Sequence, residues 1–241
     1  MKIRNSLSAA LLSTCVMCMG VAPAHAAQQT LYGTTIDVTY DDTLMGLFGL
    51  PTIAGDTLFF TPTNFKTQSL NGIGYGPIVS STLNLRITPH AGMDFSSVNL
   101  GESGDYTLSG ANSFVTVTGE IRAFDVANPS PLSSHLTNNI IATAPLNIID
   151  GLNHDWNATA ALNLASFASV QTINLTLENI LNAYTDSSDI GPKLAFIEKK
   201  FVGVSLSIVT TPVPEAHNWA MMMTGLGLVG FQLRRRQNRI G

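Results

Sequence analysis

The chain has 241 residues, of which 12% are charged, and its formal net charge is −4. Between residues 27 and 212 it carries only six Lys and Arg against fifteen Asp and Glu, because most of the remaining basic residues cluster near the two ends. Recognition of nucleic acid needs clustered Lys and Arg against phosphate. This composition therefore excludes nucleic acid as an expected partner.

Residues 1–26 have the three parts of a secretory signal peptide. Lys2 and Arg4 precede an apolar segment at about residues 7–21, and Ala24-His25-Ala26 offers small residues for cleavage. We expect export through the Sec translocon and cleavage by signal peptidase after Ala26. A retained membrane anchor is the alternative, although the apolar run is shorter than the roughly 20 residues of a spanning helix.

Both cysteines of the chain, Cys15 and Cys18, lie in this signal segment. The mature protein would then contain no cysteine, so burial of its core and not disulfides must stabilise it in an oxidising compartment. The same spacing fits a redox or metal pair, and acylation of Cys15 would make a lipoprotein. The apolar surroundings, which offer no other ligand, favour the plain signal peptide.

The region that follows, residues 27–212, alternates apolar and polar side chains with a period of two. In residues 79–88, for example, Val79, Leu83, Leu85 and Ile87 share one face. This pattern is typical of a half-buried antiparallel strand. It recurs at residues 36–40, 115–121, 156–164, 173–177 and 202–208, and shorter candidate strands lie at 58–60 and 140–141.

Connections rich in Gly, Pro, Asn and Ser separate these strands, at residues 71–77, 127–131 and 186–189. Helical periodicity is weak throughout, although residues 177–184 could form one short helical turn. We therefore predict an all-β domain at residues 27–212, an antiparallel β-sandwich of jelly-roll-like type. A signal-peptide helix would precede it and a short hydrophobic helix would follow it.

Catalytic motifs are not recognisable in this domain. It has no G-x-S-x-G motif, and His90, His135 and His154 are far apart and lack metal-ligand spacing. We predict no catalytic residue, no cofactor and no metal site, and hence no enzyme. A pair of catalytic carboxylates for glycoside cleavage cannot be recognised from spacing alone, so a polysaccharide-active enzyme remains the alternative.

Two segments of the domain could contact a ligand. Trp156 follows His154-Asp155, and a Trp beside polar groups can stack on a sugar, although a Trp at the start of an alternating strand more often packs in the core. Glu102 and Asp105 lie in a segment that we predict to be a charged turn between strands. Two such carboxylates could bind a cation such as calcium.

The end of the chain, residues 213–241, begins with Val213-Pro214-Glu215 and continues into a run at 219–233 that is apolar apart from Thr224 and Gln232. As a helix this run would span about 22 Å, which is less than a bilayer core of roughly 30 Å. Arginines follow it and would stay on the cytoplasmic side of the membrane. We therefore expect transient contact with the inner membrane.

Residues 225–230, Gly-Leu-Gly-Leu-Val-Gly, match the letters of the dinucleotide-binding fingerprint. That motif requires a preceding strand and an acidic residue about 20 positions further on, and neither is present in the sequence. We interpret Gly225, Gly227 and Gly230 as close-packing positions in a membrane-inserted segment.

This tail resembles the PEP-CTERM sorting signal of Gram-negative bacteria. The resemblance rests on Val213, Pro214, Glu215, Trp219, Gly225, Gly227, Gly230, Arg234, Arg235 and Arg236. It implies recognition by an exosortase-like membrane protease, removal of the tail and delivery to the cell surface or extracellular matrix. The second proline of the family motif is here Ala216, which leaves the turn at Glu215 less constrained.

Residues 95–122 and 195–200 resemble, more loosely, the ectodomains of such proteins, which implies a β-rich surface domain of uncharacterised activity. The leading hypothesis is an exported, non-catalytic surface or matrix protein associated with exopolysaccharide or biofilm. The alternatives are a secreted polysaccharide-active enzyme on a β-sandwich and, more remotely, an ice-binding protein. Ice binding would need several aligned Thr-x-Thr rows, whereas Thr116-Val117-Thr118 is essentially alone on its strand.

Overall fold

A computed structural model of the protein describes residues 28–188, 191–213 and 221–229, with Ser133, Phe201 and Val202 described by their backbone alone. The predicted signal peptide with its cleavage site at Ala24 and Ala26 lies outside these residues. So do Pro214, Glu215, Trp219, Gly230 and the three arginines of the predicted sorting signal. Those predictions therefore stay predictions.

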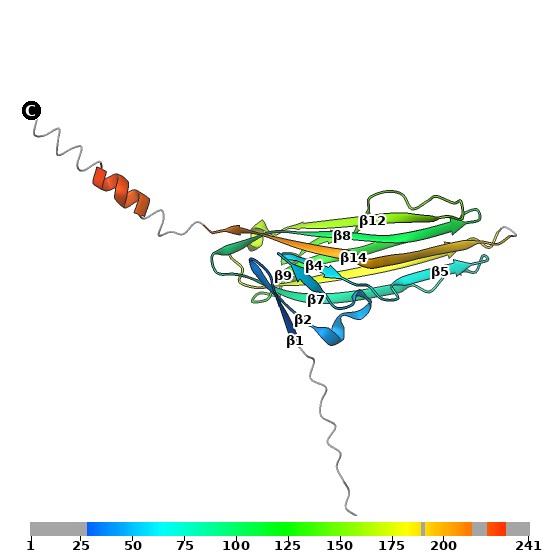
Figure 1. Cartoon of the computed structure of the whole chain (residues 1–241), viewed down its shortest axis with the longest axis horizontal. Helices are drawn as coiled ribbons and strands as arrows, with labels where there is room; N and C mark the ends of the chain where they lie inside the picture. Colours follow the sequence, from blue (N-terminus) through cyan, green and yellow to red (C-terminus); the bar gives the residue numbers. More distant parts are fainter. Residues whose placement is uncertain (1–27, 189–190, 214–220, 230–241) are drawn as a thin grey trace, which may run out of the picture.

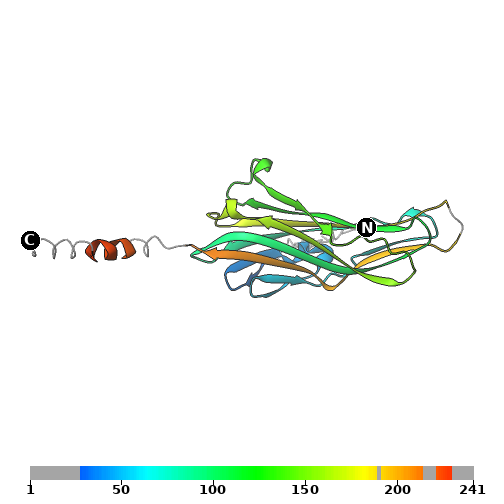
Figure 2. The same ribbon diagram turned by 90° about the horizontal axis from the view of Figure 1, so that it is seen from above.

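The described residues form two antiparallel sheets, of seven strands each, packed face to face (Figures 1 and 2). Sheet A has the order β1-β2-β7-β13-β9-β10, with β6 paired to the end of β13. Its strands are β1 (Gln28–Tyr32), β2 (Ile36–Asp41), β6 (Gly74–Tyr75), β7 (Val79–Pro89), β9 (Phe114–Asp125), β10 (Leu136–Asn139) and β13 (Ile173–Thr185).

Sheet B has the order β11-β12-β8-β14-β4-β3, with β5 also paired to β14. Its strands are β3 (Thr52–Ala54), β4 (Thr57–Phe60), β5 (Lys66–Leu70), β8 (Met93–Ser109), β11 (Ile141–Ala142), β12 (Asn153–Asn163) and β14 (Leu194–Pro212). Short 3₁₀ turns lie between strands, at η1 (Asp42–Leu44), η2 (Gly46–Phe48), η3 (Leu132–Ser134) and η4 (Ala165–Phe167).

The inner faces of the two sheets share one apolar core. In β7, Leu83, Leu85 and Ile87 are fully buried, while the residues between them are exposed. Burying such a side chain contributes roughly 1.5–3 kcal/mol, so the alternation fixes which face of each strand turns inward. The predicted antiparallel β-sandwich is confirmed.

Two local predictions are wrong. Residues 102–106 do not form a charged turn, because they lie in the middle of the 17-residue strand β8. Residues 177–184 do not form a helical turn, because they belong to β13. In β8 the inward positions include Glu102 and Gly104, which interrupt the apolar pattern, and this interruption looks like a turn in the sequence.

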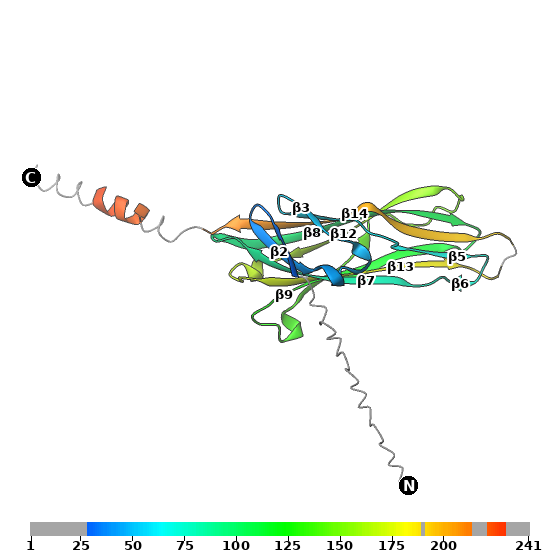
Figure 3. The same cartoon turned by 60° about the horizontal axis from the view of Figure 1, so that its bottom comes forward.

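The sandwich is elongated, and its two ends differ. Strand β14 ends at Pro212 at one end, and β5 and β6 lie at the other (Figure 3). Within the predicted tail, residues 221–229 are helical and exposed. Among the described residues, no helix combines the length and the apolar character needed to cross a membrane.

Candidate functional site

Glu102 and Asp105, which were predicted from the sequence to lie in one turn, face opposite sides of sheet B. The alternating burial of β8 turns Glu102 into the core and leaves Asp105 on the outer face. The two carboxylates therefore cannot ligate one cation, and the suggested calcium site at this pair is wrong. In the part of the chain that the structure describes, no group of three His, Cys, Asp or Glu could hold a metal ion.

Trp156 on β12 lies between the sheets and is 2% exposed. It pairs with Gly104 of β8, where an added Cβ would come within 2.4 Å of the indole. The indole Nε1–H donates a hydrogen bond of 3.1 Å to the carbonyl oxygen of Glu198. Trp156 is therefore an anchored core residue, and its ring has no open face on which a sugar could stack.

Beside Trp156, three buried polar side chains connect the two sheets. Glu102 of β8 and Lys199 of β14 belong to sheet B, and Asn179 of β13 belongs to sheet A. The Lys199 Nζ lies 2.6 Å from the Glu102 Oε2, and neither side chain is exposed. The Asn179 Nδ2–H donates to the Glu102 Oε1 at 2.5 Å. We call these residues the cross-sheet triad.

The surroundings of the triad are apolar. The Lys199 Nζ lies 5.2 Å from the centre of the Phe65 ring and 5.3 Å from that of Trp156, close enough for cation–π attraction when the amine is charged. Burial lowers the pKa of Lys199, and the charge and hydrogen bond of Glu102 offset part of that effect. The Asn179 Oδ1 is buried without a hydrogen-bond partner, which costs free energy in the folded state.

The next residue along β14, Lys200, forms a second charged cluster on the outer face of sheet B. Its Nζ lies 2.7 Å from the Asp155 Oδ1 and 3.1 Å from the Asp105 Oδ1. These carboxylates, Asp155 first, raise the pKa of Lys200, and the Lys200 hydrogen bond lowers the pKa of Asp155. We call these residues the surface triad.

A polar groove of about 240 Å³ lies beside the surface triad on the same face of sheet B. Small polar side chains and glycines line it, because β8, β12 and the irregular part of β14 present short residues there. They include Gly101, Ser103, Asn157, Thr159, Gly203 and Ser205. These hydroxyl and amide groups suit a neutral polar ligand.

An aromatic cluster lies on the outer face of sheet A, at the end of the sandwich away from Pro212. Phe114 of β9 and Tyr184 of β13 are register partners, and their rings stack with centroids 4.8 Å apart. Tyr75 of β6 packs edge-on against both and is 61% exposed. We call these three residues the aromatic trio.

Polar groups adjoin the aromatic trio. The Asn182 Nδ2–H donates to the Thr116 Oγ1 at 3.2 Å, one register step along from Tyr184 and Phe114. Two residues beyond Tyr184, hydrogen bonds from Ser188 and Asn112 lower the pKa of Asp186 to about 2. An exposed aromatic face bordered by amide, hydroxyl and carboxylate groups is chemically suited to a sugar chain.

Sequence reasoning missed the aromatic trio because its members are about 40 and 70 positions apart and are brought together by strand register. It also missed the cross-sheet triad, apart from Glu102. The one available signal was a Lys at an inward position of an alternating segment: Ala195, Ile197 and Lys199 are all buried.

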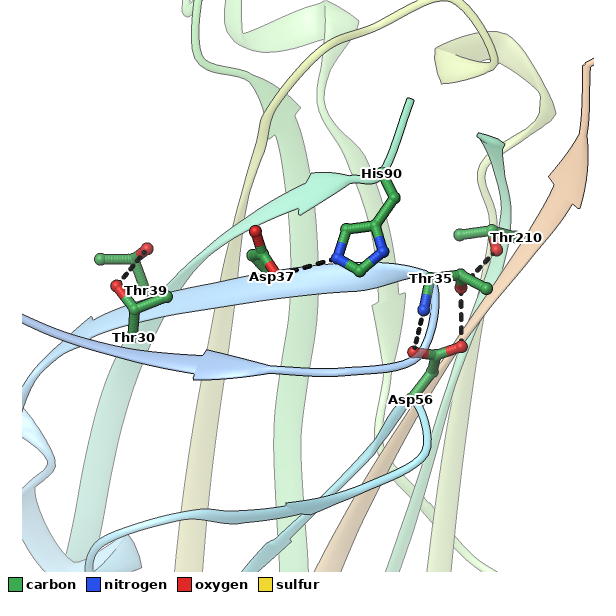
Figure 4. Close-up of polar contacts among 7 residues, drawn as sticks. All are labelled: Thr30, Thr35, Asp37, Thr39, Asp56, His90 and Thr210. Atoms are coloured by element: carbon green, nitrogen blue, oxygen red, sulfur yellow. Dashed lines mark hydrogen bonds and ion pairs between the residues drawn. The ribbon is translucent and has the colours of Figure 1, made fainter. Parts of the chain in front are cut away.

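At the end of the sandwich near Pro212, a group of hydrogen bonds ties three segments together (Figure 4). The Asp56 carboxylate accepts hydrogen bonds from the Thr35 N–H at 2.9 Å and the Thr35 hydroxyl at 2.7 Å. That hydroxyl also lies 2.7 Å from the Thr210 Oγ1 on β14. Nearby, the His90 Nε2 contacts Asp37 at 2.9 Å, and the Thr30 and Thr39 hydroxyls lie 3.3 Å apart. The contacts of Thr35 with Asp56 and Thr210 hold the last residues of β14 to the β1–β2 and β3–β4 turns.

The chain is therefore a β-sandwich with a buried polar triad between its sheets, a polar groove on the outer face of sheet B and an aromatic cluster on the outer face of sheet A. No family model matches it, and no curated protein matches it. Among solved structures, the chain is similar to the structure of infectious bursal disease virus Gx strain, with a TM-score of 0.29 and 10% identity. The match covers 75% of this chain and 49% of that one.

It is also similar to the enzymatically active domain of bacteriophage CBA120 tailspike protein 4 (TM-score 0.20, 11% identity), covering 76% of this chain and 19% of that one. A third structure concerns carbohydrate-binding modules from the β-sandwich superfamily (TM-score 0.19, 8% identity), covering 78% of this chain and 87% of that one. This chain thus spans about half of the first structure and a fifth of the second. At these TM-scores the likenesses carry no functional argument.

Proposed function

We propose that the protein is an exported, non-catalytic surface or matrix protein that contacts exopolysaccharide through the outer faces of its sandwich. The observation that carries the proposal is the aromatic trio. Tyr75 is exposed, its ring packs edge-on against Phe114 and Tyr184, and polar groups border the cluster. Aromatic rings offer a large, rigid contact area at low entropic cost.

The predicted signal peptide and the resemblance of the tail to PEP-CTERM signals support export and sorting to the surface. In this proposal an exosortase-like protease removes the tail after transient contact with the inner membrane. Mass spectrometry of the protein recovered from culture tests this part. We expect a species that begins at Ala27 and lacks the segment after about Val213, and a species retaining Arg234 would contradict removal of the tail.

Binding is tested by affinity measurements of the wild type, Tyr75→Ala and Tyr32→Ala on the polysaccharide of the producing cells. Tyr32 is a suitable control because it is 75% exposed and lies on β1, outside the aromatic trio. We expect Tyr75→Ala to weaken binding about tenfold, the effect of losing roughly 1.4 kcal/mol, and Tyr32→Ala to leave it unchanged. A wild type that is not retained, or equal losses in both variants, would contradict the proposal.

The absence of catalysis stays a prediction. It is tested by incubating the protein with the same polysaccharide and measuring released reducing ends. A release that one Asp or Glu substitution abolishes would establish the alternative, a polysaccharide-active enzyme.

A further inference from the structure

The cross-sheet triad places an amine, a carboxamide and a carboxyl group in contact. Glu102 uses one oxygen for the Lys199 Nζ, at 2.6 Å, and the other for the Asn179 Nδ2, at 2.5 Å. The amine and the amide are therefore held beside each other on one carboxyl group. They come from different sheets, Asn179 from β13 and Lys199 from β14. An amine, a primary amide and a carboxyl group that contacts both are the groups that a transamidation needs: a nucleophile, an acyl group and a proton carrier.

The triad is closed to solvent, which disfavours the charged form of the Lys199 amine. The side chains of Glu102 and Lys199 are both 0% exposed, and Phe65 and Trp156 flank the amine. Moving the proton from the Lys199 ammonium to the Glu102 carboxylate removes two buried charges. It leaves an amine with a free electron pair, and the lowered pKa of Lys199 agrees with this transfer.

The buried Asn179 Oδ1, which has no hydrogen-bond partner, can accept a hydrogen bond from Glu102 in that neutral state, in exchange for the bond that Nδ2 makes now. When Glu102 is protonated and the Asn179 amide is turned over, the Glu102 hydroxyl can donate to Oδ1. A side-chain amide can be placed in either orientation, and the hydrogen-bond network decides between them. Donation to Oδ1 draws electrons from Cγ and makes that carbon electrophilic.

We propose that Lys199 and Asn179 become joined by an intramolecular isopeptide bond, with Glu102 as the catalytic carboxyl group. The neutral Lys199 Nζ attacks the Asn179 Cγ, and a new C–N bond forms. Glu102 accepts a proton from the attacking nitrogen and gives one to the departing Nδ2. The Cγ–Nδ2 bond breaks and one ammonia leaves. An amine and a primary amide give a secondary amide and ammonia, so the step needs no oxidant and no other reactant.

The bond would connect the facing sheets of the sandwich through the core. It would also close the loop between β13 and β14 into a covalent ring. The mature domain contains no cysteine, so this link would serve as the covalent cross-link that disulfides provide in other exported domains.

The proposal is tested by tryptic digestion and mass spectrometry of the folded full chain, kept folded until it is denatured for digestion. Cleavage after Arg122 and Lys193 gives a segment 123–193 that contains Asn179, and cleavage after Lys200 gives a segment 194–200 that contains Lys199. We expect one branched peptide that joins the two segments. Its mass should be below their sum by one ammonia, about 17 Da. This readout does not depend on how the two ends of the chain are processed.

Matched variants separate the reaction from general effects on folding. Lys200→Arg, which keeps the tryptic site but removes the amine, and Asn182→Ala should keep the branched peptide, because Lys200 and Asn182 face outward and carry the same functional groups as Lys199 and Asn179. Asn179→Ala, Lys199→Met and Glu102→Gln should lose it, with circular dichroism reporting whether each variant folds. If these three variants fail to fold, the peptide masses of the wild type alone test the proposal. A folded wild type that gives separate, full-mass peptides after prolonged incubation would overturn the proposal, as would a branched peptide that survives in folded Glu102→Gln.

Discussion

Lys199 and Lys200 are consecutive residues of β14 with opposite environments. Lys199 points into the core against Glu102, while Lys200 points outward between Asp105 and Asp155. The pKa of Lys199 is lowered, because the effect of burial outweighs that of Glu102. The pKa of Lys200 is raised, because its hydrogen bonds to Asp155 and Asp105 outweigh its desolvation. The comparison shows that the face of the strand, and not the residue type, decides what a lysine contributes.

The largest expected effect follows from removing the partner of the buried lysine. Glu102→Ala leaves the Lys199 and Asn179 side-chain nitrogens without their buried hydrogen-bond acceptor, and removing one partner of a buried pair in this way costs about 3–5 kcal/mol. The free energy of unfolding in urea should fall by that amount. Asp155→Ala, which removes the exposed carboxylate from the surface triad, should cost less than about 1 kcal/mol. Equal losses in the two variants would mean that burial does not separate the two lysines.

A smaller effect is expected where Gly104 makes room for the inner cluster. A Cβ at this position would come within 2.0 Å of the Glu198 carbonyl oxygen and 2.4 Å of the Trp156 ring. We expect Gly104→Ala to lower the free energy of unfolding by about 1–3 kcal/mol, the usual cost of overpacking.

Gly101→Ala is the control for this prediction, measured by the same urea titration. Gly101 lies on the outer face of the same strand, and an added Cβ there would meet only the Ser205 hydroxyl, at 3.1 Å. Gly101→Ala should lower the free energy of unfolding clearly less than Gly104→Ala. If Gly101→Ala were as unstable as Gly104→Ala, the loss could not be assigned to the contacts of Gly104 with Glu198 and Trp156.

The smallest expected effect concerns Lys200→Ala. The variant should leave stability at neutral pH nearly unchanged, because exposed ion pairs contribute little. The pKa of Asp155 should rise toward its ordinary value, since the Lys200 hydrogen bond is the first cause of its lowering. Titration of the carboxyl carbons by NMR measures this change.

The pH dependence of the surface triad has a defined sign. A carboxyl group with a lowered folded-state pKa stabilises the fold above its unfolded value, about 3.9 for Asp. That contribution disappears as the pH falls through the folded value. Lys200→Ala should therefore be less sensitive than the wild type to acid below about pH 4. A steeper acid response in the variant would contradict the assigned pairing.

Much of the fold could be predicted from the sequence because burial imposes a period of two on each strand. Residues 79–88 and 173–177 show this alternation, and both lie on central strands of sheet A. The apolar alternation is interrupted in β8, because Glu102 and Gly104 occupy inward positions, and this part of the strand was therefore predicted to be a turn. Their places in the core depend on Lys199 and Trp156, which come from other strands.

The candidate sites were harder to predict for the same reason. Asn179 sits in an ordinary alternating strand, and only the packing of sheet A on sheet B brings it to Glu102. Tyr75, Phe114 and Tyr184 likewise meet through the registers of β6, β9 and β13. Trp156 was proposed to contact a sugar, but its size suits the space that Gly104 leaves in the core.

The position of β14 has a mechanical consequence. This strand pairs antiparallel with β8 along most of its length and with β4 and β5 on its other side. A pull on the chain beyond Pro212 acts along the axis of β14, whereas its ladder hydrogen bonds run perpendicular to that axis. The bonds then carry the load together in shear instead of breaking one by one. The pairing of β14 would thus resist tension applied to the chain at Pro212.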